Sequence, residues 1–199
     1  MRVIGGTFRS RRLETLRGMA LRPSSDRLRE TLFNILGPDV KDTIFVDLFA
    51  GSGAVGIEAL SRGAHGCIFV ENHAAGAALI ARNLASLGIA SATNVGSRKT
   101  FGGTAEILRM DAMDALERLD KAGARMEFVF ADPPYANRRA YQEILEFLSE
   151  SDLLVRGGRL ILEHRRNNQL PMLAGSLERK RIVQQGDTAL SFYAPLLAA

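Results

Sequence analysis

The sequence predicts a doubly wound α/β domain, in which helices cover both faces of a mostly parallel sheet. Three observations support this prediction. From residue 43 onward, short apolar runs alternate with helical segments. Several of these runs are apolar at nearly every position, as expected for strands that are covered on both faces. The runs also end in acidic residues or glycines. These residues would lie at the carboxyl ends of the strands, where open α/β sheets bind ligands.

The size and composition suit one domain with a small appendage. The chain has 199 residues, of which 46% are hydrophobic. No repeat, secretory signal or membrane-spanning run is visible. The single cysteine, Cys67, cannot form an internal disulfide, and no Cys/His cluster has metal-ligand spacing. We therefore expect a cytoplasmic monomer with no bound metal and no membrane partner.

Positive charge gathers at the start of the chain. Residues 1–30 contain eight arginines and only three acidic residues, against a net charge of +4 for the whole protein. The stretch RVIGGTFRSRRL also suggests two short strands and a turn. We expect residues 1–22 to form a basic β-hairpin arm that binds nucleic acid, ahead of a main domain at 23–199. A solvated charged face is the alternative reading.

The elements follow in order along the chain. The stretch RPSSDRLRETLFNIL predicts a helix that Ser24 or Ser25 caps and that ends at Gly37–Pro38. Segment 93–105 is longer than a usual connection and could be a mobile surface loop or a small hairpin. A final hairpin turns at Gly186–Asp187. The expected strands are 43–50, 66–72, 105–111, 127–132 and 157–164, and the expected helices between them are 53–62, 73–87, 112–122 and 139–149.

A glycine-rich turn follows the first expected strand. Gly51, Gly53 and Gly56 spell G-x-G-x-x-G, and Glu71 lies 20 residues after Gly51. This spacing matches the dinucleotide fingerprint, in which the glycines admit a ligand to a helix N-terminus and the acid accepts ribose hydroxyls. A tight strand-to-helix turn without a ligand would show the same pattern.

The acidic strand ends favour a cationic ligand over a dinucleotide. Asp47 comes four residues before Gly51, where a carboxylate would repel a pyrophosphate. It suits a ligand with an ammonium group, such as S-adenosylmethionine, while Glu71 binds the ribose and Asp111 binds the adenine amine. Any one of these acids could instead cap a helix.

The stretch FVFADPPYANRR places Asp132, two prolines and Tyr135 after the fourth expected strand. The exocyclic amine of a base becomes nucleophilic when acceptors hold its N–H hydrogens and its lone pair leaves the ring. The Asp132 carboxylate and the Pro133 carbonyl are two such acceptors, and the prolines stiffen the backbone that carries them. Tyr135 can stack on the base. An Asp–Pro turn that only begins a loop is the alternative.

These residues resemble the RsmD family of class I S-adenosylmethionine-dependent methyltransferases, which methylate a guanine N2 in 16S ribosomal RNA. The resemblance rests on DLFAGSGAVGIEALSRGA, FVEN, ADPPY, RVIGGTFRSRRL, RPSSDRLRETLFNIL and GDTALSFY, and it covers almost the whole chain. It implies a Rossmann-like methyltransferase sheet of seven strands whose last strand is antiparallel. It also implies that the N-terminal arm helps to bind 16S rRNA, either free or within an assembling small ribosomal subunit.

The resemblance extends to the site residues. Positioning of the amine falls to Asp132, Pro133 and Tyr135. The set expected to bind S-adenosylmethionine is Asp47, Phe49, Ala50, Gly51, Gly53, Glu71, Asn72, Asp111, Ala112 and Asp132. The set expected to bind RNA is Arg2, Arg9, Arg11, Arg12, Arg22 and Arg27.

Other functions fit parts of the pattern. The same turn could hold adenine N6 of DNA or a glutamine amide of a protein. The glycine motif with Glu71 would also suit a nicotinamide-dependent oxidoreductase, and the basic arm would suit a nucleic-acid-binding module without catalysis. Glu163 and His164 end the fifth expected strand, where a lone histidine is more often a surface residue than a base.

Overall fold

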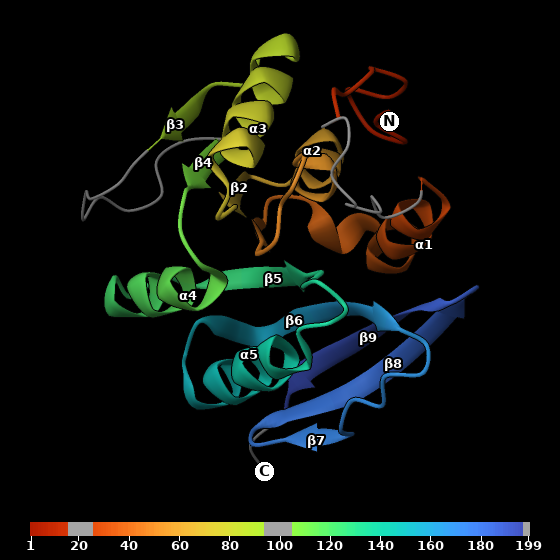
Figure 1. Ribbon diagram of the computed structural model, residues 1–199, viewed down its shortest axis with the longest axis vertical. Helices are drawn as coiled ribbons and strands as arrows, with labels where there is room; N and C mark the ends of the chain where they lie inside the picture. Colours follow the sequence, from red (N-terminus) through yellow and green to blue (C-terminus); the bar gives the residue numbers. More distant parts are fainter. Residues whose placement is uncertain (16–25, 94–104, 197–199) are drawn as a thin grey trace. The chain divides into compact units, whose positions relative to one another are not determined.

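The computed structural model describes residues 1–15, 26–93 and 105–196 (Figure 1). The chain divides into two compact units, Met1–Ala112 and Met113–Ala199. The expected domain boundary at residue 22 lies outside the described residues, as do Arg22 and most of segment 93–105.

The first unit contains four parallel strands in the order β3-β4-β2-β1. Helix α2 packs against β1 and β2, and α3 packs against β3 and β4. Every residue of β2 is buried, as its uninterrupted apolar run predicts. The elements are α1 (Asp26–Leu36), the 3-10 helix η1 (Gly37–Val40), β1 (Ile44–Asp47), α2 (Ala54–Ser61), β2 (Gly66–Val70), α3 (Ala74–Ser86), β3 (Ser91–Thr93) and β4 (Ala105–Leu108).

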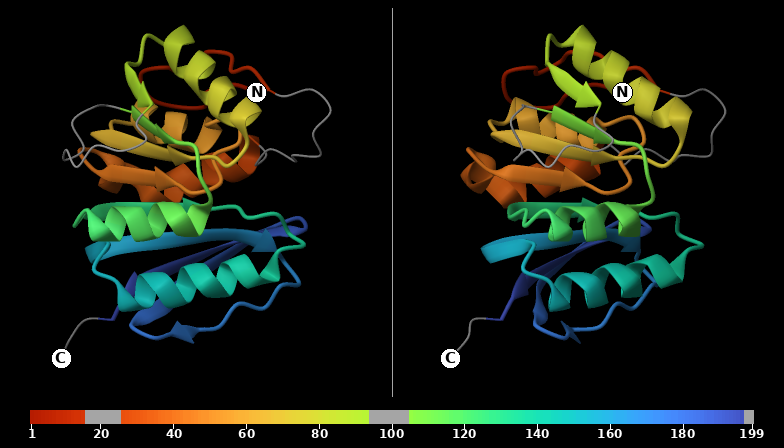
Figure 2. Two further views of the ribbon diagram at one scale, coloured as in Figure 1. Left: turned by 60° about the vertical axis from the view of Figure 1, so that its left-hand side comes forward. Right: turned by 90° about the vertical axis from the view of Figure 1, so that its left-hand side faces the viewer.

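The second unit has the strand order β5-β6-β9-β8-β7. Strands β5 and β6 are parallel, and β9 runs antiparallel to both β6 and β8. Helices α4 and α5 lie on the same face of β5 and β6 in both views of Figure 2. The elements are α4 (Ala112–Lys121), β5 (Met126–Ala131), α5 (Arg138–Glu150), β6 (Leu154–Arg165), β7 (Leu173–Ala174), β8 (Leu177–Gln185) and β9 (Thr188–Pro195).

The predicted α/β fold is confirmed. Each of the seven expected strands is present, and the last one, β9, is antiparallel to β6 as expected. The described residues add two short strands, β3 and β7, that the sequence did not predict. Gly186, with φ at 59°, forms the turn between β8 and β9. No helix within the described ranges is long and apolar enough to cross a membrane.

The predicted β-hairpin arm is not confirmed. Residues 1–15 form one isolated antiparallel bridge, Arg2 to Arg12, in place of two strands. Two backbone hydrogen bonds form the bridge, from the Val3 N–H to the Arg11 carbonyl and from the Leu13 N–H to the Met1 carbonyl, both at 3.0 Å. The side chains of Val3 and Leu13 are buried. We call residues 1–15 the N-terminal segment, because they are packed into the first unit.

Candidate active site

The glycine turn connects β1 to α2 in a left-handed backbone conformation. Gly51 has φ at 54° and Gly53 has φ at 78°, values that a residue with a Cβ rarely adopts. Gly56 has a different role, because a Cβ there would lie 2.3 Å from Cε1 of Phe69 and 2.5 Å from Sγ of Cys67. Two glycines therefore shape the turn, and the third lets α2 pack closely against β2.

Glu71 is held beside this turn, just after β2. Its carboxylate accepts hydrogen bonds from the backbone N–H of Gly51 and the backbone N–H of His73, both at 2.8 Å. Gly76 makes room for it, since a Cβ at that position would lie 2.7 Å from Cγ of Glu71. A carboxylate can accept about four hydrogen bonds, so Glu71 keeps capacity for ribose hydroxyls.

The space beside the turn suits a ligand. A Cβ on Gly51 would meet only the Phe49 carbonyl oxygen, at 4.0 Å. The turn also precedes the N-terminus of α2, whose backbone N–H groups favour polar ligand atoms. The arrangement of Gly51, Gly53 and Glu71 therefore fits a nucleoside such as the one in S-adenosylmethionine.

Asp47 is the last residue of β1 and only 1% exposed. Its Oδ2 accepts the backbone N–H of Gly56 at 3.1 Å, in the first turn of α2. Burial, followed by the charge of Asp47, raises the pKa of the Cys67 thiol. The structure thus gives Asp47 the helix-capping role that the sequence left open, and its contact with a ligand stays a prediction.

The remaining residues of the predicted donor set in the first unit follow β1, β2 and β4. Asp111 is exposed and directly precedes α4, which begins at Ala112. Ala50 is buried, and its N–H donates to the Val70 carbonyl at 2.9 Å. Phe49 is partly buried and Asn72 is exposed. Their roles in binding stay predictions.

In the second unit, residues 132–135 form a turn after β5. We call it the acceptor turn, because Asp132 and Pro133 are the predicted acceptors of the amine hydrogens. Asp132 is partly buried, Pro133 is buried and Pro134 is exposed. The Asn137 N–H donates to the Pro134 carbonyl at 2.7 Å, and the Asn137 side chain accepts the Ala140 N–H at 3.2 Å to cap α5. The turn is therefore tied at once to a strand and to a helix N-terminus.

Tyr141, which sequence reasoning missed, supports this turn from α5. Its side chain is fully buried, and its hydroxyl lies 3.4 Å from the Pro133 carbonyl and 3.1 Å from the Glu163 carbonyl. Burial raises the pKa of the Tyr141 hydroxyl, and the nearby Asp132 carboxylate raises it further. The hydroxyl therefore stays protonated and can donate to either carbonyl.

Tyr135 is contacted at its hydroxyl and over its ring. Its hydroxyl lies 3.3 Å from Oγ1 of Thr188, the first residue of β9. The guanidinium carbon of Arg165 lies 5.3 Å from the centre of the Tyr135 ring, a distance typical of a cation–π contact. Thr188 belongs to the GDTALSFY stretch, whereas Arg165 lies outside the motifs that the sequence revealed.

The expectation that His164 lies at the surface is wrong, because His164 is fully buried. Its Nδ1 lies 2.8 Å from the Arg165 carbonyl, and its Nε2 lies 2.8 Å from Oγ of Ser191. A carbonyl can only accept, so Nδ1 carries the hydrogen and Nε2 accepts from the serine. Burial lowers the pKa of His164, which is therefore a neutral core residue.

The predicted RNA-binding arginines that the structure describes, Arg2, Arg9, Arg11, Arg12 and Arg27, are all exposed. Arg29 is not, since its side chain is 0% exposed. It donates to the Arg2 carbonyl at 2.7 Å and to Asp26 at 2.9 Å. Part of the N-terminal positive charge is therefore used inside the fold.

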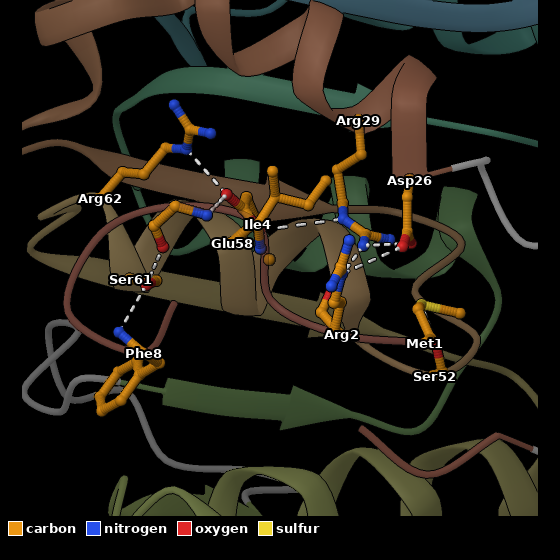
Figure 3. Close-up of polar contacts among 12 residues, drawn as sticks. Met1, Arg2, Ile4, Phe8, Asp26, Arg29, Ser52, Glu58, Ser61 and Arg62 are labelled. Carbon is orange, nitrogen blue, oxygen red and sulfur yellow. Dashed lines mark hydrogen bonds and ion pairs between the residues drawn. The ribbon is translucent and has the colours of Figure 1, made fainter. Parts of the chain in front are cut away.

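Glu58 anchors the N-terminal segment to α2 (Figure 3). This buried carboxylate accepts the backbone N–H of Ile4 at 2.7 Å and that of Gly5 at 2.8 Å. It also bonds Nε of Arg62 at 2.8 Å and lies 3.9 Å from Nε of Arg29. The segment is thus fixed by a buried charge cluster that spans distant parts of the sequence.

Asn83 ties the same segment to the glycine turn. Its buried side chain accepts the Glu14 N–H at 2.8 Å and donates to the Glu14 carbonyl at 3.2 Å. It also donates to the carbonyl of Ser52, between Gly51 and Gly53, at 2.9 Å. One amide side chain on α3 therefore holds both the segment and the turn.

The comparisons with known proteins identify the family and the fold. The chain matches the family described as conserved hypothetical protein 95 over residues 1–194. It is 35% identical over 187 residues to ribosomal RNA small subunit methyltransferase D of Escherichia coli strain K12, covering 93% of this chain and 86% of that protein. The chain belongs to the RsmD family.

Two further comparisons cover nearly the full length. YlbH of Bacillus subtilis strain 168, provisionally named an rRNA methyltransferase, is 34% identical over 193 residues, or 97% of this chain and 98% of that protein. The solved structure of Escherichia coli yhhF, provisionally named a methyltransferase, superposes with a TM-score of 0.81 at 33% identity, covering 100% of this chain and 99% of that one. This chain therefore has the RsmD-family sequence and a methyltransferase-like fold throughout.

Proposed function

We propose that this chain transfers a methyl group from S-adenosylmethionine to the exocyclic N2 of a guanine in 16S ribosomal RNA. The observation that carries the proposal is the Pro133 carbonyl, which lies within reach of the buried Tyr141 hydroxyl and next to Asp132. Two relatives whose names include rRNA methyltransferase activity support the substrate class. When bound, S-adenosylmethionine supplies an electrophilic methyl group on a sulfonium.

In this proposal the acceptor turn orients the guanine amine for methyl transfer. The Asp132 carboxylate and the Pro133 carbonyl accept the two N–H hydrogens of the guanine amine, which directs its lone pair away from the ring. Tyr135 stacks on the base and holds it in plane. Because these groups are fixed before the substrate arrives, little of the binding energy is spent on ordering them. One amine proton then leaves to Asp132 or to water.

The donor side of the proposal rests on the first unit. Glu71 would accept the ribose hydroxyls, Asp111 would accept the adenine amine, and Asp47 would face the cationic end. The backbone of Gly51 and Gly53 would lie against the ligand. Neighbouring contacts would come from Phe49, Ala50, Asn72 and Ala112.

For the RNA we propose contacts from the arginines near the N-terminus, which suit phosphate recognition. In this proposal residues 1–22 form the RNA-binding part and 23–199 form the methyltransferase domain. The protein would act as a cytoplasmic monomer, on free 16S rRNA or on an assembling small subunit. The proposed contacts are Arg2, Arg9, Arg11, Arg12, Arg22 and Arg27.

The test is methyl transfer from labelled S-adenosylmethionine into four probes: 16S rRNA, small ribosomal subunits, duplex DNA and a glutamine-containing protein. The proposal expects label in one or both ribosomal probes, recovered as N2-methylguanine. Asp132→Ala should abolish turnover while leaving the affinity for RNA within about two-fold, because it removes an acceptor and little RNA-binding surface.

The other outcomes separate the competing functions. Label in DNA or in the glutamine-containing protein would show that the substrate is DNA or protein in place of ribosomal RNA. Tight NADH binding in calorimetry, without binding of S-adenosylhomocysteine, would favour an oxidoreductase. RNA binding without any binding of S-adenosylhomocysteine would favour a module that lacks catalysis.

A further inference from the structure

Arg165 covers one face of the Tyr135 ring. It is the last residue of β6 and is exposed, and its guanidinium carbon lies 5.3 Å from the ring centre. Its backbone is fixed from two sides. Residue 165 is in register with Thr188 of β9, and its carbonyl accepts from the buried His164. The guanidinium therefore has a defined place at the acceptor turn.

A guanidinium over a ring can still donate hydrogen bonds. The cation–π contact uses none of its five N–H donors on an acceptor atom. Within the described part of the chain, Arg165 forms no ion pair with a carboxylate. An exposed forked donor of this kind suits a phosphate.

The occupied face of Tyr135 limits where a base can stack. In the proposed function a base stacks on Tyr135, and with Arg165 over one face that base takes the other. The thickness of the ring then separates the guanidinium from the hydrogen-bonding edge of that base. The sugar-phosphate backbone, which passes around the edge of the ring, is the acceptor that remains within reach.

We infer that Arg165 binds a phosphate of the RNA strand that carries the target guanine, across the Tyr135 ring from the base. This inference rests on the proposed function and adds to it a substrate contact in the second unit, far in sequence from the N-terminal arginines. Arg165 would thus position the strand while Asp132 and Pro133 position the amine.

The test compares Arg165→Gln with Arg156→Gln. Both arginines are exposed and lie on β6, but Arg156 lies near the start of the strand. Because β5 and β6 are parallel, that end is opposite to the acceptor turn. The readout is the RNA concentration that half-saturates single-turnover methyl transfer, measured from about 50 to 200 mM KCl, the range in which phosphate contacts weaken strongly. The probe is whichever of 16S rRNA and small subunits the wild type methylates.

Arg165→Gln should raise the half-saturating concentration about ten-fold at low salt, as expected for one charge-assisted contact. It should also reduce the steepness of the log–log salt dependence by about 0.7, the value for one phosphate of a single strand. Arg165→Lys should keep the wild-type salt slope, because it keeps the charge. Arg156→Gln should match the wild type in both quantities.

A wild-type salt slope in Arg165→Gln would overturn the inference, and so would equal changes in the two glutamine variants. Both outcomes leave the proposed function intact, because they still require methyl transfer by the wild type. If the wild type methylates neither RNA probe, the proposed function fails first, and the inference falls with it.

Discussion

The hydroxyl of Tyr141 lies 3.4 Å from the carbonyl oxygen of Pro133, in the buried interior of the second unit. It also lies 3.1 Å from the Glu163 carbonyl, so one side chain on α5 contacts both the acceptor turn and β6. In the proposed reaction, the direction of the Pro133 carbonyl decides where an amine hydrogen can be held. That direction depends on a residue outside the motif that supplies the carbonyl.

Tyr141→Phe tests this dependence. Without the hydroxyl, the Pro133 carbonyl loses a donor, and we expect kcat to fall about ten-fold while the half-saturating RNA and donor concentrations stay within about two-fold. The free energy of unfolding should fall by about 1 kcal/mol, from the loss of one buried hydrogen bond. Steady-state kinetics and urea unfolding measure the two effects.

Tyr193→Phe is the matched control for that variant. Tyr193 is also fully buried, and its hydroxyl donates to the Pro171 carbonyl, away from the acceptor turn. It should lose a similar free energy of unfolding and keep the wild-type kcat. Equal losses of kcat in the two variants would mean that Tyr141 acts only through stability.

Glu58→Gln should strongly destabilise the first unit. Its buried carboxylate receives two backbone N–H groups and faces Arg29, whose side chain is 0% exposed. Neutralising it leaves the buried Arg29 with Asp26 as its remaining carboxylate partner, and removing one partner of a buried charge cluster typically costs about 3 kcal/mol. Glu117→Gln removes an exposed pair with Lys121 and should cost less than about 1 kcal/mol. If urea unfolding showed that Glu58→Gln and Glu117→Gln lose similar free energies of unfolding, the anchoring role of Glu58 would be refuted.

Asn83→Ala should weaken donor binding. The change removes the hydrogen bond to the Ser52 carbonyl in the glycine turn and two bonds to Glu14. We expect the dissociation constant for S-adenosylhomocysteine to rise about ten-fold, because the turn loses the side chain that holds its Ser52 carbonyl. Arg82→Gln, which removes an exposed ion pair with the Glu14 side chain, should leave this constant unchanged. If calorimetry gave Asn83→Ala the wild-type dissociation constant for S-adenosylhomocysteine, the glycine turn would keep its shape without Asn83.

His164 gives the stability a pH dependence. Burial holds its pKa below the ordinary value of 6.5, so the unfolded chain takes up this proton first as the pH falls. The contribution of His164 to the free energy of unfolding is therefore fully present above pH 6.5 and declines as the pH drops from there toward the pKa in the folded state. His164→Gln should flatten the curve between about pH 7 and 5. His65→Gln, at an exposed position, should follow the wild-type curve, and an unchanged slope in His164→Gln would contradict this account.

The sequence predicts the long elements well because each one carries its own pattern. The apolar run of β2 and the buried face of α5 are readable without any tertiary contact. Strand β3 spans three residues and β7 spans two, too few for an alternating pattern to be recognised. The seven longer strands could therefore be predicted, and these two could not.

Local patterns fail where polar residues are buried by distant partners. Arg29 and Glu58 look like solvent-facing helix residues. Each is buried against a partner that is tens of residues away in the sequence: Arg29 and Glu58 face each other, and Glu58 also accepts from the Ile4 backbone. His164 can be buried because Ser191 on the neighbouring strand donates a hydrogen bond to its Nε2. The glycine turn, the acidic strand ends and the Asp132–Tyr135 stretch could be recognised as a candidate site, because their backbone and charge requirements are local.

The account as a whole depends on the methylation of a guanine N2 in small-subunit ribosomal RNA by this chain. The most direct test is mass spectrometry of that RNA from cells that lack the protein. One N2-methylguanosine should be absent, should return with the wild-type chain, and should stay absent with Asp132→Ala. An unchanged set of N2-methylguanosines in the deletion strain would contradict the account.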